Sequence, residues 1–313
     1  MPKYLVTGGA GFIGCNLSRF LLDKGHGVVV LDDFSTGKRE NVADMLGRIE
    51  LIEGDIRDRA AVDRAVAGCA AIFHEAALGS VPRSVKDPVT SHDVNVNGTI
   101  TVLEAARAAG VKRVIFAASS SAYGEQAASP KHEGMAPAPI SPYAATKVAC
   151  EGYMQAYAAA YGMETLCLRY FNVFGPHQDP EGAYAAVIPA FVSRVLAGDR
   201  PTVFGDGEQS RDFCYIDNVC DANWLAAQAS AEVCRGQALN IACCHATTLN
   251  QILDKVKSLI GSDIQADYTD PRPGDVRDSL ADISLARQTI GYEPQIYFEE
   301  GLDRAIGWYR ENL

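Results

Sequence analysis

The chain has 313 residues, 48% of them hydrophobic and 21% charged, as in globular proteins of one or two domains. Its formal net charge of −11 disfavours partnership with nucleic acid or an anionic membrane surface, so an anionic ligand would need a few local arginines. The nine cysteines are scattered without a CxxC pair, which favours reduced thiols in a cytoplasmic protein over a disulfide framework or a metal site. The chain enters a strand within three residues and has no apolar run of membrane-spanning length, so we expect neither signal peptide nor membrane anchor.

A glycine-rich turn follows the first predicted strand, 4–6, and leads into a helix with apolar residues at helical spacing. A strand that turns on glycines into a helix brings backbone N–H groups and a helix N-terminus up to a pyrophosphate. The sequence therefore predicts a dinucleotide site here. The residues expected in it are Gly8, Gly11, Phe12, Ile13 and Gly14.

The second predicted strand, 28–31, ends in an acidic residue about 20 positions further on, where a carboxylate can accept from ribose hydroxyls. In the polar turn that follows, Lys38 and Arg39 could reach the 2′-phosphate of NADP. The neighbouring Asp32 and Asp33 would repel such a phosphate, so NAD is favoured as the cofactor. This stretch is expected to contribute Asp32, Asp33, Ser35, Thr36 and Gly37 to the cofactor site.

Two further predicted strands, 49–53 and 70–74, also end in candidate site residues, because ligands bind at the carboxyl ends of such strands. Asp55 could meet adenine; the alternative is that it caps the helix from about residue 59 to 67, a role that suits Asp58 better. Small residues after the next strand suit a cofactor that runs close to the backbone. The candidates here are Asp55, Ile56, Ala76 and Ala77.

A loop is expected at 78–88, followed by a long helical stretch to about residue 109 and a strand at 112–118. That strand runs into Ser119, Ser120 and Ser121, which are either turn formers or site residues; their position favours the site. Strands that alternate with helices in this way predict an α/β fold with a doubly wound parallel sheet.

The dipeptide Ser141-Pro142 predicts a helix start, and Gly162 predicts its end. Within this helix Tyr143 and Lys147 are four residues apart and share one face. A phenol is a poor base at neutral pH, but a nearby ammonium and an oxidised nicotinamide would stabilise the phenolate. Such pairs are common on surface helices. Behind a dinucleotide site, however, the pair favours proton abstraction from an alcohol whose hydride passes to NAD⁺.

The sixth predicted strand, 165–169, leads to Tyr170 and Asn172, beyond which proline and glycine become frequent. We therefore expect a Rossmann domain at 1–172 and a smaller C-terminal α/β substrate-binding domain at 173–313. A predicted strand at 238–242 is expected to return to the main sheet.

The chain resembles the extended short-chain dehydrogenase/reductases, specifically the nucleotide-sugar 4-epimerases. The resemblance spans the chain through the motifs TGGAGFIG, GDIRD, FHEAA, NVNGT, SSSAYG, YAATK, RYFNVFGP, RDFCYIDNV and RPGDVR. It implies a tightly held NAD that is regenerated in each turnover, with Tyr170 among the residues around it. It also implies Tyr143 as the base, Lys147 as the residue that holds the nicotinamide ribose, and Ser119 as a bridge to the sugar O4.

Two relatives are disfavoured by the serines after the fifth strand. Nucleotide-sugar 4,6-dehydratases carry an Asp-Glu pair where Ser120 and Ser121 stand, and decarboxylases usually carry a glutamate in place of Ser121. Without such an acid, dehydration is not expected.

The resemblance further implies a UDP-sugar substrate, and two arginines could offset the charge of its diphosphate in an otherwise acidic protein. The residues that match diphosphate-, uridine- and sugar-binding positions are Asn172, Ala186, Val187, Arg211, Arg272 and Asp275. The stretches ALGSVPRS, AASSSAYG and GPHQDPEGAYAAVIP are similar to those of epimerases that accept N-acetylated sugars. In these, Ser80, Ser120, Ser121 and Gln178 would lie around the 2-acetamido group.

Ser279 matches a position that is tyrosine in relatives limited to unsubstituted hexoses and small in users of acetylated sugars. The alternative is that it is a polar turn residue outside the pocket. A second hypothesis keeps the epimerase mechanism but assigns UDP-glucuronate, or UDP-glucose alone, as the substrate. The non-enzyme hypothesis is a dinucleotide-sensing regulator, although such proteins usually lose the Tyr–Lys pair. The resemblance also implies a homodimer through the two long helices.

Overall fold

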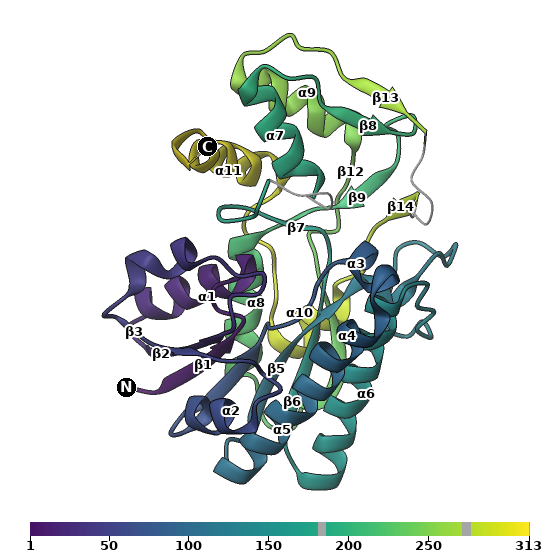
Figure 1. The fold of residues 1–313 in the computed structure, drawn as a ribbon. Coiled ribbons are helices and arrows are strands. Elements are labelled where there is room, and N and C mark those ends of the chain that lie inside the picture. Colours follow the sequence, from purple (N-terminus) through teal and green to yellow (C-terminus); the bar gives the residue numbers. More distant parts are fainter. Residues whose placement is uncertain (181–185, 271–276, 313) are drawn as a thin grey trace.

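The predicted strand–helix alternation forms one parallel sheet of seven strands, seen in the lower part of the computed structural model in Figure 1. The structure describes residues 1–180, 186–270 and 277–312. In spatial order the strands are β11 (Arg235–Ile241), β6 (Glu164–Tyr170), β5 (Arg113–Ser119), β4 (Ala71–His74), β1 (Lys3–Thr7), β2 (Gly27–Asp32) and β3 (Ile49–Glu53). The expected α/β class with a Rossmann-like parallel sheet is confirmed.

Helices cover both faces of this sheet, and each face has its own apolar core. One face carries α2 (Arg59–Val66), α5 (Gly98–Ala109) and α6 (Pro142–Tyr161), and the other carries α1 (Phe12–Asp23), α8 (Ile216–Gln228) and α10 (Ser284–Ile290). Strand residues are buried on both faces, which explains their nearly continuous apolar runs.

Local sequence signals set the helix ends. Ser141 caps α6 by accepting from the Ala144 N–H at 3.2 Å, Pro142 occupies the first turn, and Gly162 ends the helix at φ +67°. Asp58 caps α2 through the Ala60 N–H, as the sequence suggested. The segment expected as a loop at 78–88 is different: it contains the short helix α3 (Val81–Lys86), because Ser80 accepts from the Arg83 N–H and Pro82 fits the first turn. It continues through α4 (Pro88–His92) and a π-helical turn, Asp93–Asn97, into α5.

The structure has a large part, which is the seven-stranded sheet with its covering helices, and a small part. The small part lies above the carboxyl ends of the sheet strands in Figure 1. Its helices are α7 (Val187–Ala197), α9 (Leu249–Ile260) and α11 (Phe298–Asn312). Its short strands are β7 (Val173–Phe174), β8 (Thr202–Phe204), β9 (Ser210–Asp212), β10 (Cys214–Tyr215), β12 (Ala246–Thr248), β13 (Asp267–Thr269) and β14 (Asp278–Ser279). They pair as β10-β7, β12-β9-β14 and β13-β8.

The chain does not pass once from the large part to the small one. After β10 it returns through α8 and β11, and β11 pairs in parallel with β6 at the edge of the main sheet. The strand expected at 238–242 therefore runs from 235 to 241 and lies in that sheet. The division of the chain into two domains at residue 172 stays a proposal, with 216–241 belonging structurally to the first.

Buried Asp212, at the end of β9, connects this strand to the segment after β11 and to the segment after β14 through hydrogen bonds. One carboxylate oxygen accepts from the Cys243 N–H at 2.9 Å and the other accepts from the Ala281 N–H at 3.2 Å. Burial raises the pKa of Asp212 to about 6, against the opposing effect of these hydrogen bonds.

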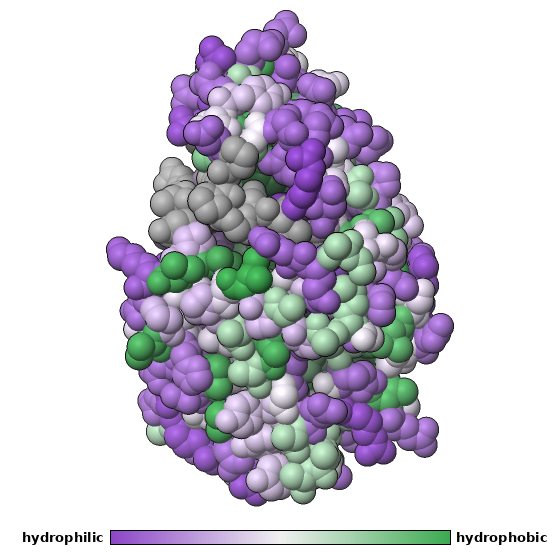
Figure 2. Space-filling model, turned by 90° about the vertical axis from the view of Figure 1, so that its right-hand side faces the viewer, coloured by the Kyte–Doolittle hydropathy of each residue, from purple (hydrophilic) through white to green (hydrophobic). Residues whose placement is uncertain are grey.

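Figure 2 shows that the small part is mostly hydrophilic at the surface, whereas hydrophobic residues are scattered over the face of the large part that carries α6. Among the described helices, none combines the length and the apolar character that a membrane crossing requires.

Candidate active site

The turn after β1 is shaped by its glycines. Gly8 has φ +69°, and a Cβ built on it would lie 2.7 Å from the Cα of Ala76, so only glycine fits between β1 and the segment after β4. A Cβ on Gly14 would lie 2.2 Å from the carbonyl oxygen of Gly8. Helix α1 begins at Phe12, and within the described chain no side chain caps its N-terminus. These open N–H groups and the missing Cβ atoms fit the pyrophosphate of a dinucleotide.

Most of the expected cofactor residues line one pocket beside this turn. They are Gly8, Gly11, Asp32, Asp33, Ser35, Thr36, Ile56, Ala76 and Ala77. The Asp32 carboxylate also fixes the loops around it, because its oxygens accept from the Ala10 N–H at 2.9 Å and the Phe34 N–H at 2.8 Å. Burial raises the pKa of Asp32. Gly37 packs tightly behind this residue: an added Cβ would lie 2.9 Å from Asp32 Oδ1.

Asp55 lies beside this pocket, where Arg57 binds its carboxylate at 2.6 Å. The same arginine contacts Asp93 at 2.5 Å, so it links the end of β3 to the segment before α5. Its hydrogen bonds hold the pKa of Asp55 below the usual range. The carboxylate is therefore tied to the wall of the pocket, and the expected contact with adenine stays a prediction.

The two cations that could have bound the 2′-phosphate of NADP already form ion pairs with carboxylates of this chain. Lys38 contacts Asp179 at 3.1 Å, and Arg39 contacts Glu53 at 2.7 Å while its guanidinium lies 4.1 Å from the Phe34 ring centre. This arrangement favours NAD over NADP, as the sequence did.

The Tyr143–Lys147 pair lies in the first turns of α6. The Tyr143 N–H donates to Ser84 Oγ at 3.0 Å, so α3 fixes the start of the helix that carries the tyrosine. Lys147 is buried, and its Nζ donates to the Ala117 carbonyl in β5 at 2.6 Å. The same Nζ lies 5.9 Å from the centre of the Tyr143 ring. The Lys147 ammonium is thus held between the carboxyl end of β5 and the Tyr143 ring.

The three serines follow Ala118 at the carboxyl end of β5. Ser119 Oγ accepts from the Ser121 N–H at 3.2 Å and bonds the Ser121 hydroxyl at 2.9 Å. It caps the short turn Ser120–Tyr123, which packs against α6. The structure therefore brings hydroxyls, and no acidic pair, to the positions that distinguish dehydratases.

A buried polar network supports this edge, and the sequence analysis did not identify it. Asn95 accepts from the Leu78 N–H at 2.8 Å and donates to Thr146 Oγ1 at 3.0 Å, so it joins the segment after β4 to α6. His74 lies between Thr7 and Thr99 at 2.7 and 2.9 Å, and burial lowers its pKa to about 3. The NVNGT motif was the available signal for this network.

Tyr170 and Glu75 form a pair beside the dinucleotide pocket. The Tyr170 hydroxyl donates to Glu75 Oε1 at 2.9 Å and accepts from Asn223 of α8 at 2.7 Å, and the expected contact of Tyr170 with the cofactor stays a prediction. Glu75, which received no role, lines the dinucleotide pocket, and burial raises the pKa of its carboxyl to about 7.

A second pocket of about 390 Å³ lies in the small part, next to the segment that follows β6, and gathers four expected substrate residues: Asn172, Ala186, Val187 and Arg211. The sequence did not indicate its other lining residues, which come from α7, β8, the residue between β9 and β10, and the start of α9: Ala190, Phe191, Arg194, Thr202, Phe204, Phe213 and Leu249. Arg211 is held in place by donating to the carbonyls of Ser210 and Arg277 at 2.8 and 3.0 Å.

Ser279 pairs with Arg211 across β14 and β9, while the preceding Asp278 pairs with Ser210. Paired residues point to the same face and successive ones to opposite faces. Arg211 lines the 390 Å³ pocket, whereas Ser210 and Asp278 line another hollow, so Ser279 is on the same face as Arg211.

Two expected substrate residues, Ser80 and Gln178, bond to nearby backbone groups and do not line this pocket. Ser80 caps α3, and the Gln178 amide folds back to donate to the Val173 carbonyl at 3.1 Å. Arg272 and Asp275 lie outside the described residues.

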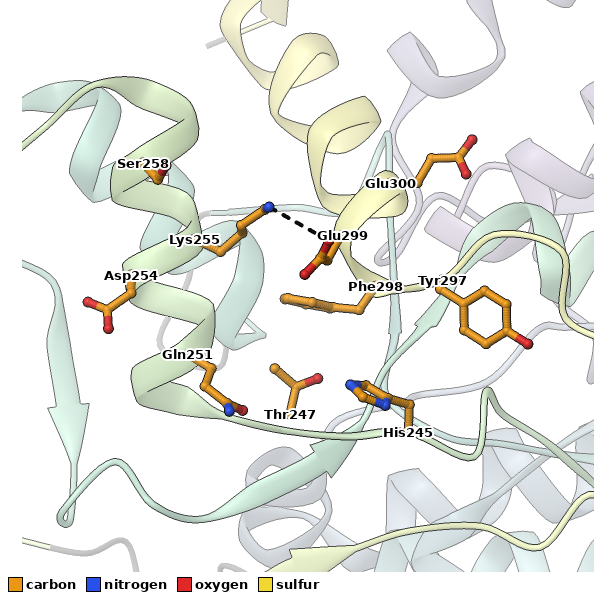
Figure 3. Close-up of a pocket in the computed structure, with 10 residues that line it drawn as sticks. All are labelled: His245, Thr247, Gln251, Asp254, Lys255, Ser258, Tyr297, Phe298, Glu299 and Glu300. Atoms are coloured by element: carbon orange, nitrogen blue, oxygen red, sulfur yellow. Dashed lines mark ion pairs between the residues drawn. The ribbon is translucent and has the colours of Figure 1, made fainter.

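A larger cavity, of about 810 Å³, lies elsewhere, between α9 and the start of α11 (Figure 3). Figure 3 shows the Lys255–Glu299 ion pair, of 3.8 Å, above the Phe298 ring, with Tyr297 and His245 at one side. Its lining residues in the described structure include none that was expected at the site. The expected residues that line a pocket do so in the two smaller ones, beside the glycine turn and around Arg211.

Comparison with known proteins agrees with this arrangement. The family model described as "NAD dependent epimerase/dehydratase family" matches residues 4–242. The chain is 39% identical over 317 residues to the UDP-glucose 4-epimerase of Mycolicibacterium smegmatis, with 98% of each chain covered. It superposes on the UDP-N-acetylglucosamine 4-epimerase of Methanobrevibacter ruminantium, in complex with UDP-N-acetylmuramic acid, with a TM-score of 0.94 at 38% identity, covering 100% of this chain and 99% of that one. For the UDP-glucose 4-epimerase of Thermotoga maritima with UDP-glucose, the TM-score is 0.93 at 38% identity, with 99% of each chain covered.

Proposed function

Because the chain belongs to the NAD dependent epimerase/dehydratase family, we propose that it inverts C4 of both plain and N-acetylated UDP-hexoses. The enzyme is an NAD-dependent UDP-sugar 4-epimerase. The finer proposal is that it interconverts UDP-N-acetylglucosamine with UDP-N-acetylgalactosamine and UDP-glucose with UDP-galactose.

The residues around the glycine turn fit NAD. The uncapped start of α1 would hold the pyrophosphate, and Asp32 would accept from a ribose hydroxyl. When bound, NAD supplies the group that takes up hydride from C4 and returns it.

Tyr143 is the proposed base. It takes the proton of the C4 hydroxyl as that carbon is oxidised, and it returns the proton when the carbon is reduced on its other face. Lys147 supports this exchange by placing a buried ammonium 5.9 Å from the centre of the Tyr143 ring. Ser119 has a hydroxyl at the end of β5 that would orient the sugar O4.

The proposed sugar must turn over between the two transfers, so the volume on the substrate side decides what is accepted. The observation that carries the finer proposal is Ser279, a small residue on the same face as Arg211. An acetamido group needs space that a larger side chain at this position would fill. In the described residues Ser120 and Ser121 add hydroxyls and no acid, which argues against elimination of water from the sugar.

The test is to incubate the purified enzyme with UDP-glucose, UDP-N-acetylglucosamine and UDP-glucuronate and to resolve the products by NMR. We expect 4-epimers of the first two and no net accumulation of NADH. Conversion of UDP-glucose alone, or of UDP-glucuronate in preference, would contradict the substrate proposal. Steady NADH formation would indicate a dehydrogenase.

A cytoplasmic homodimer through α5 and α6 completes the proposal. Tyr153 and Tyr161 of α6 are 39% and 55% exposed. All nine cysteines are free thiols, as in a reducing compartment. Light scattering on the purified protein should give the mass of two chains, and a monomer would refute this part.

A further inference from the structure

Glu75 has an unusual position for a carboxyl group. It lines the dinucleotide pocket, and its side chain reaches Tyr170 at the end of β6 and the face of the sheet that carries α8. Its Oε1 accepts from the Tyr170 hydroxyl at 2.9 Å. Its Oε2 is shielded from solvent and has no hydrogen-bond partner among the described residues. A buried polar atom without a partner is costly and calls for an explanation.

The neighbours of Glu75 determine where it can carry a proton. The Tyr170 hydroxyl accepts from Asn223 Nδ2 at 2.7 Å, so its single proton is directed at Glu75 Oε1. The pKa of Tyr170 is far above its ordinary value because of burial, so the phenol keeps that proton. Oε1 is therefore an acceptor in both states, and a proton on Glu75 resides on Oε2.

Three other titratable groups face this carboxyl. Tyr170 comes from β6, Lys147 from α6 and Cys220 from α8. Burial raises the pKa of the carboxyl to about 7, against the opposing effects of the Tyr170 hydrogen bond and the Lys147 charge. Burial keeps the Cys220 thiol protonated by raising its pKa well above the usual value. The group that changes charge near neutral pH is therefore Glu75 itself.

The contact with Tyr170, which pairs with Ser119 across β6 and β5, places Glu75 toward the end of the site where the serines and the Tyr143–Lys147 pair lie. The hydride leaves C4 of the sugar and the proton leaves the hydroxyl on that same carbon, so the ring that accepts hydride must reach the Tyr143–Lys147 end. That ring is positively charged in oxidised NAD and neutral in reduced NAD. A carboxyl nearby would stabilise the first form when it is ionised and the second when it is protonated.

We propose that Glu75 is a cofactor-positioning residue that is ionised beside oxidised NAD and protonated on Oε2 beside reduced NAD. Binding of oxidised NAD to the protonated site then releases that proton to solvent, whereas binding of reduced NAD retains it. Both forms are thereby held firmly, as an enzyme that must not lose its cofactor between two hydride transfers requires. This inference rests on the proposed epimerase function.

The experiment equilibrates the full-length protein with mixtures of NAD⁺ and NADH between pH 6 and 8.5, without sugar. The bound forms are separated by rapid gel filtration and quantified by absorbance. For the wild type, we expect the preference for NAD⁺ over NADH to rise about tenfold with pH, the factor that one unit of pKa shift corresponds to. Glu75→Gln keeps an oxygen that accepts from Tyr170 but cannot ionise, so its preference should not change with pH.

Two further variants complete the test. Glu133→Gln removes another partly buried carboxyl, one that accepts from the Asn240 N–H and does not line the pocket, and should behave as the wild type. Tyr170→Phe removes the hydrogen bond that lowers the pKa of Glu75, so the pH dependence should persist with a higher midpoint; this variant carries the test if Glu75→Gln does not fold.

A wild-type preference that is independent of pH, or an unchanged pH dependence in Glu75→Gln, would overturn the inference. Because no sugar is present, these outcomes leave the epimerase proposal untouched. Conversely, failure to epimerise UDP-sugars with the pH dependence intact would count against the proposed function alone.

Discussion

The site has two halves: a cofactor half, which is the dinucleotide pocket beside the glycine turn, and a substrate half, which is the 390 Å³ pocket around Arg211. Different kinds of structure form the two. Around the dinucleotide pocket, position is fixed by the backbone: Gly8 at positive φ, the uncapped start of α1, and loops bonded to Asp32. Around the substrate pocket, side chains from short strands and α7 converge, and their neighbours are distant in sequence, as in the pairing of β14 with β9. A backbone-built site tolerates few changes of shape, whereas a side-chain-built site can change its ligand by a single substitution. The predictions below test this contrast.

The largest effect is expected at the catalytic residue of the cofactor half. Tyr143→Phe removes only the hydroxyl that moves the proton, so turnover should fall by about 10²–10⁴-fold while the fold and NAD binding persist. The measurement is kcat with UDP-glucose, alongside circular dichroism and bound NAD. Tyr153→Phe, in the exposed part of the same helix, should keep full activity. Near-normal turnover of Tyr143→Phe would refute the proton-transfer role.

A smaller and selective effect is expected in the substrate half. Ser279→Tyr should reduce epimerisation of UDP-N-acetylglucosamine about tenfold to a hundredfold, since overpacking costs about 1–3 kcal/mol. Exchange of UDP-glucose and UDP-galactose should continue. Asp278→Tyr, on the other face of the same strand, should leave the ratio of the two activities unchanged. An equal loss of both activities in Ser279→Tyr would mean that volume at this position does not select the substrate.

The pH dependence of stability probes the cofactor half without ligand. The pKa of Glu75 is raised from 4.5 to about 7, so the folded chain keeps a proton that the unfolded chain loses. Stability from this group is therefore present below pH 4.5 and lost as pH rises to 7, by up to about 3 kcal/mol at about 1.4 kcal/mol per unit. Glu75→Gln should thus raise the melting temperature of the NAD-free protein at pH 8 and change it little at pH 4.5.

The exposed acid Glu40 serves as the control, because Glu40→Gln should give the same small difference at both pH values. A Glu75→Gln variant that is equally stabilised at pH 4.5 and pH 8 would show that its carboxyl does not titrate in this range.

The smallest effects compare one helix cap in each half. Asp58→Ala removes the cap of α2, and Thr248→Ala removes the reciprocal cap with Gln251 at the start of α9. Each should lower the free energy of unfolding by about 1 kcal/mol. Because β11 and α8 tie the halves together, both variants should shift one common transition in denaturant. A separate transition that moves only in Thr248→Ala would show that the small part unfolds independently.

The same contrast decides what could be predicted from the sequence. The sheet, the ends of α6 and the glycine turn follow from local signals, namely period, caps and φ requirements, and the structure bears them out. The loop expected at 78–88 was wrong because Ser80 and Pro82 start a helix that tertiary contacts with Tyr143 support. Glu75 and Phe204 could not be identified, since burial and convergence from distant strands leave no local pattern.

The return of the chain through α8 and β11 determines which pieces of the enzyme can be exchanged. A fragment ending at residue 172 would leave the edge of β6 unpaired and one face of the sheet without α8, a state prone to aggregation. Chimaeras that graft a relative's substrate half onto this cofactor half should therefore retain residues 216–241 with the sheet. The piece that can be exchanged therefore consists of separate stretches of the chain. A cut at a single position would divide the hydrophobic core that the main sheet shares with α8.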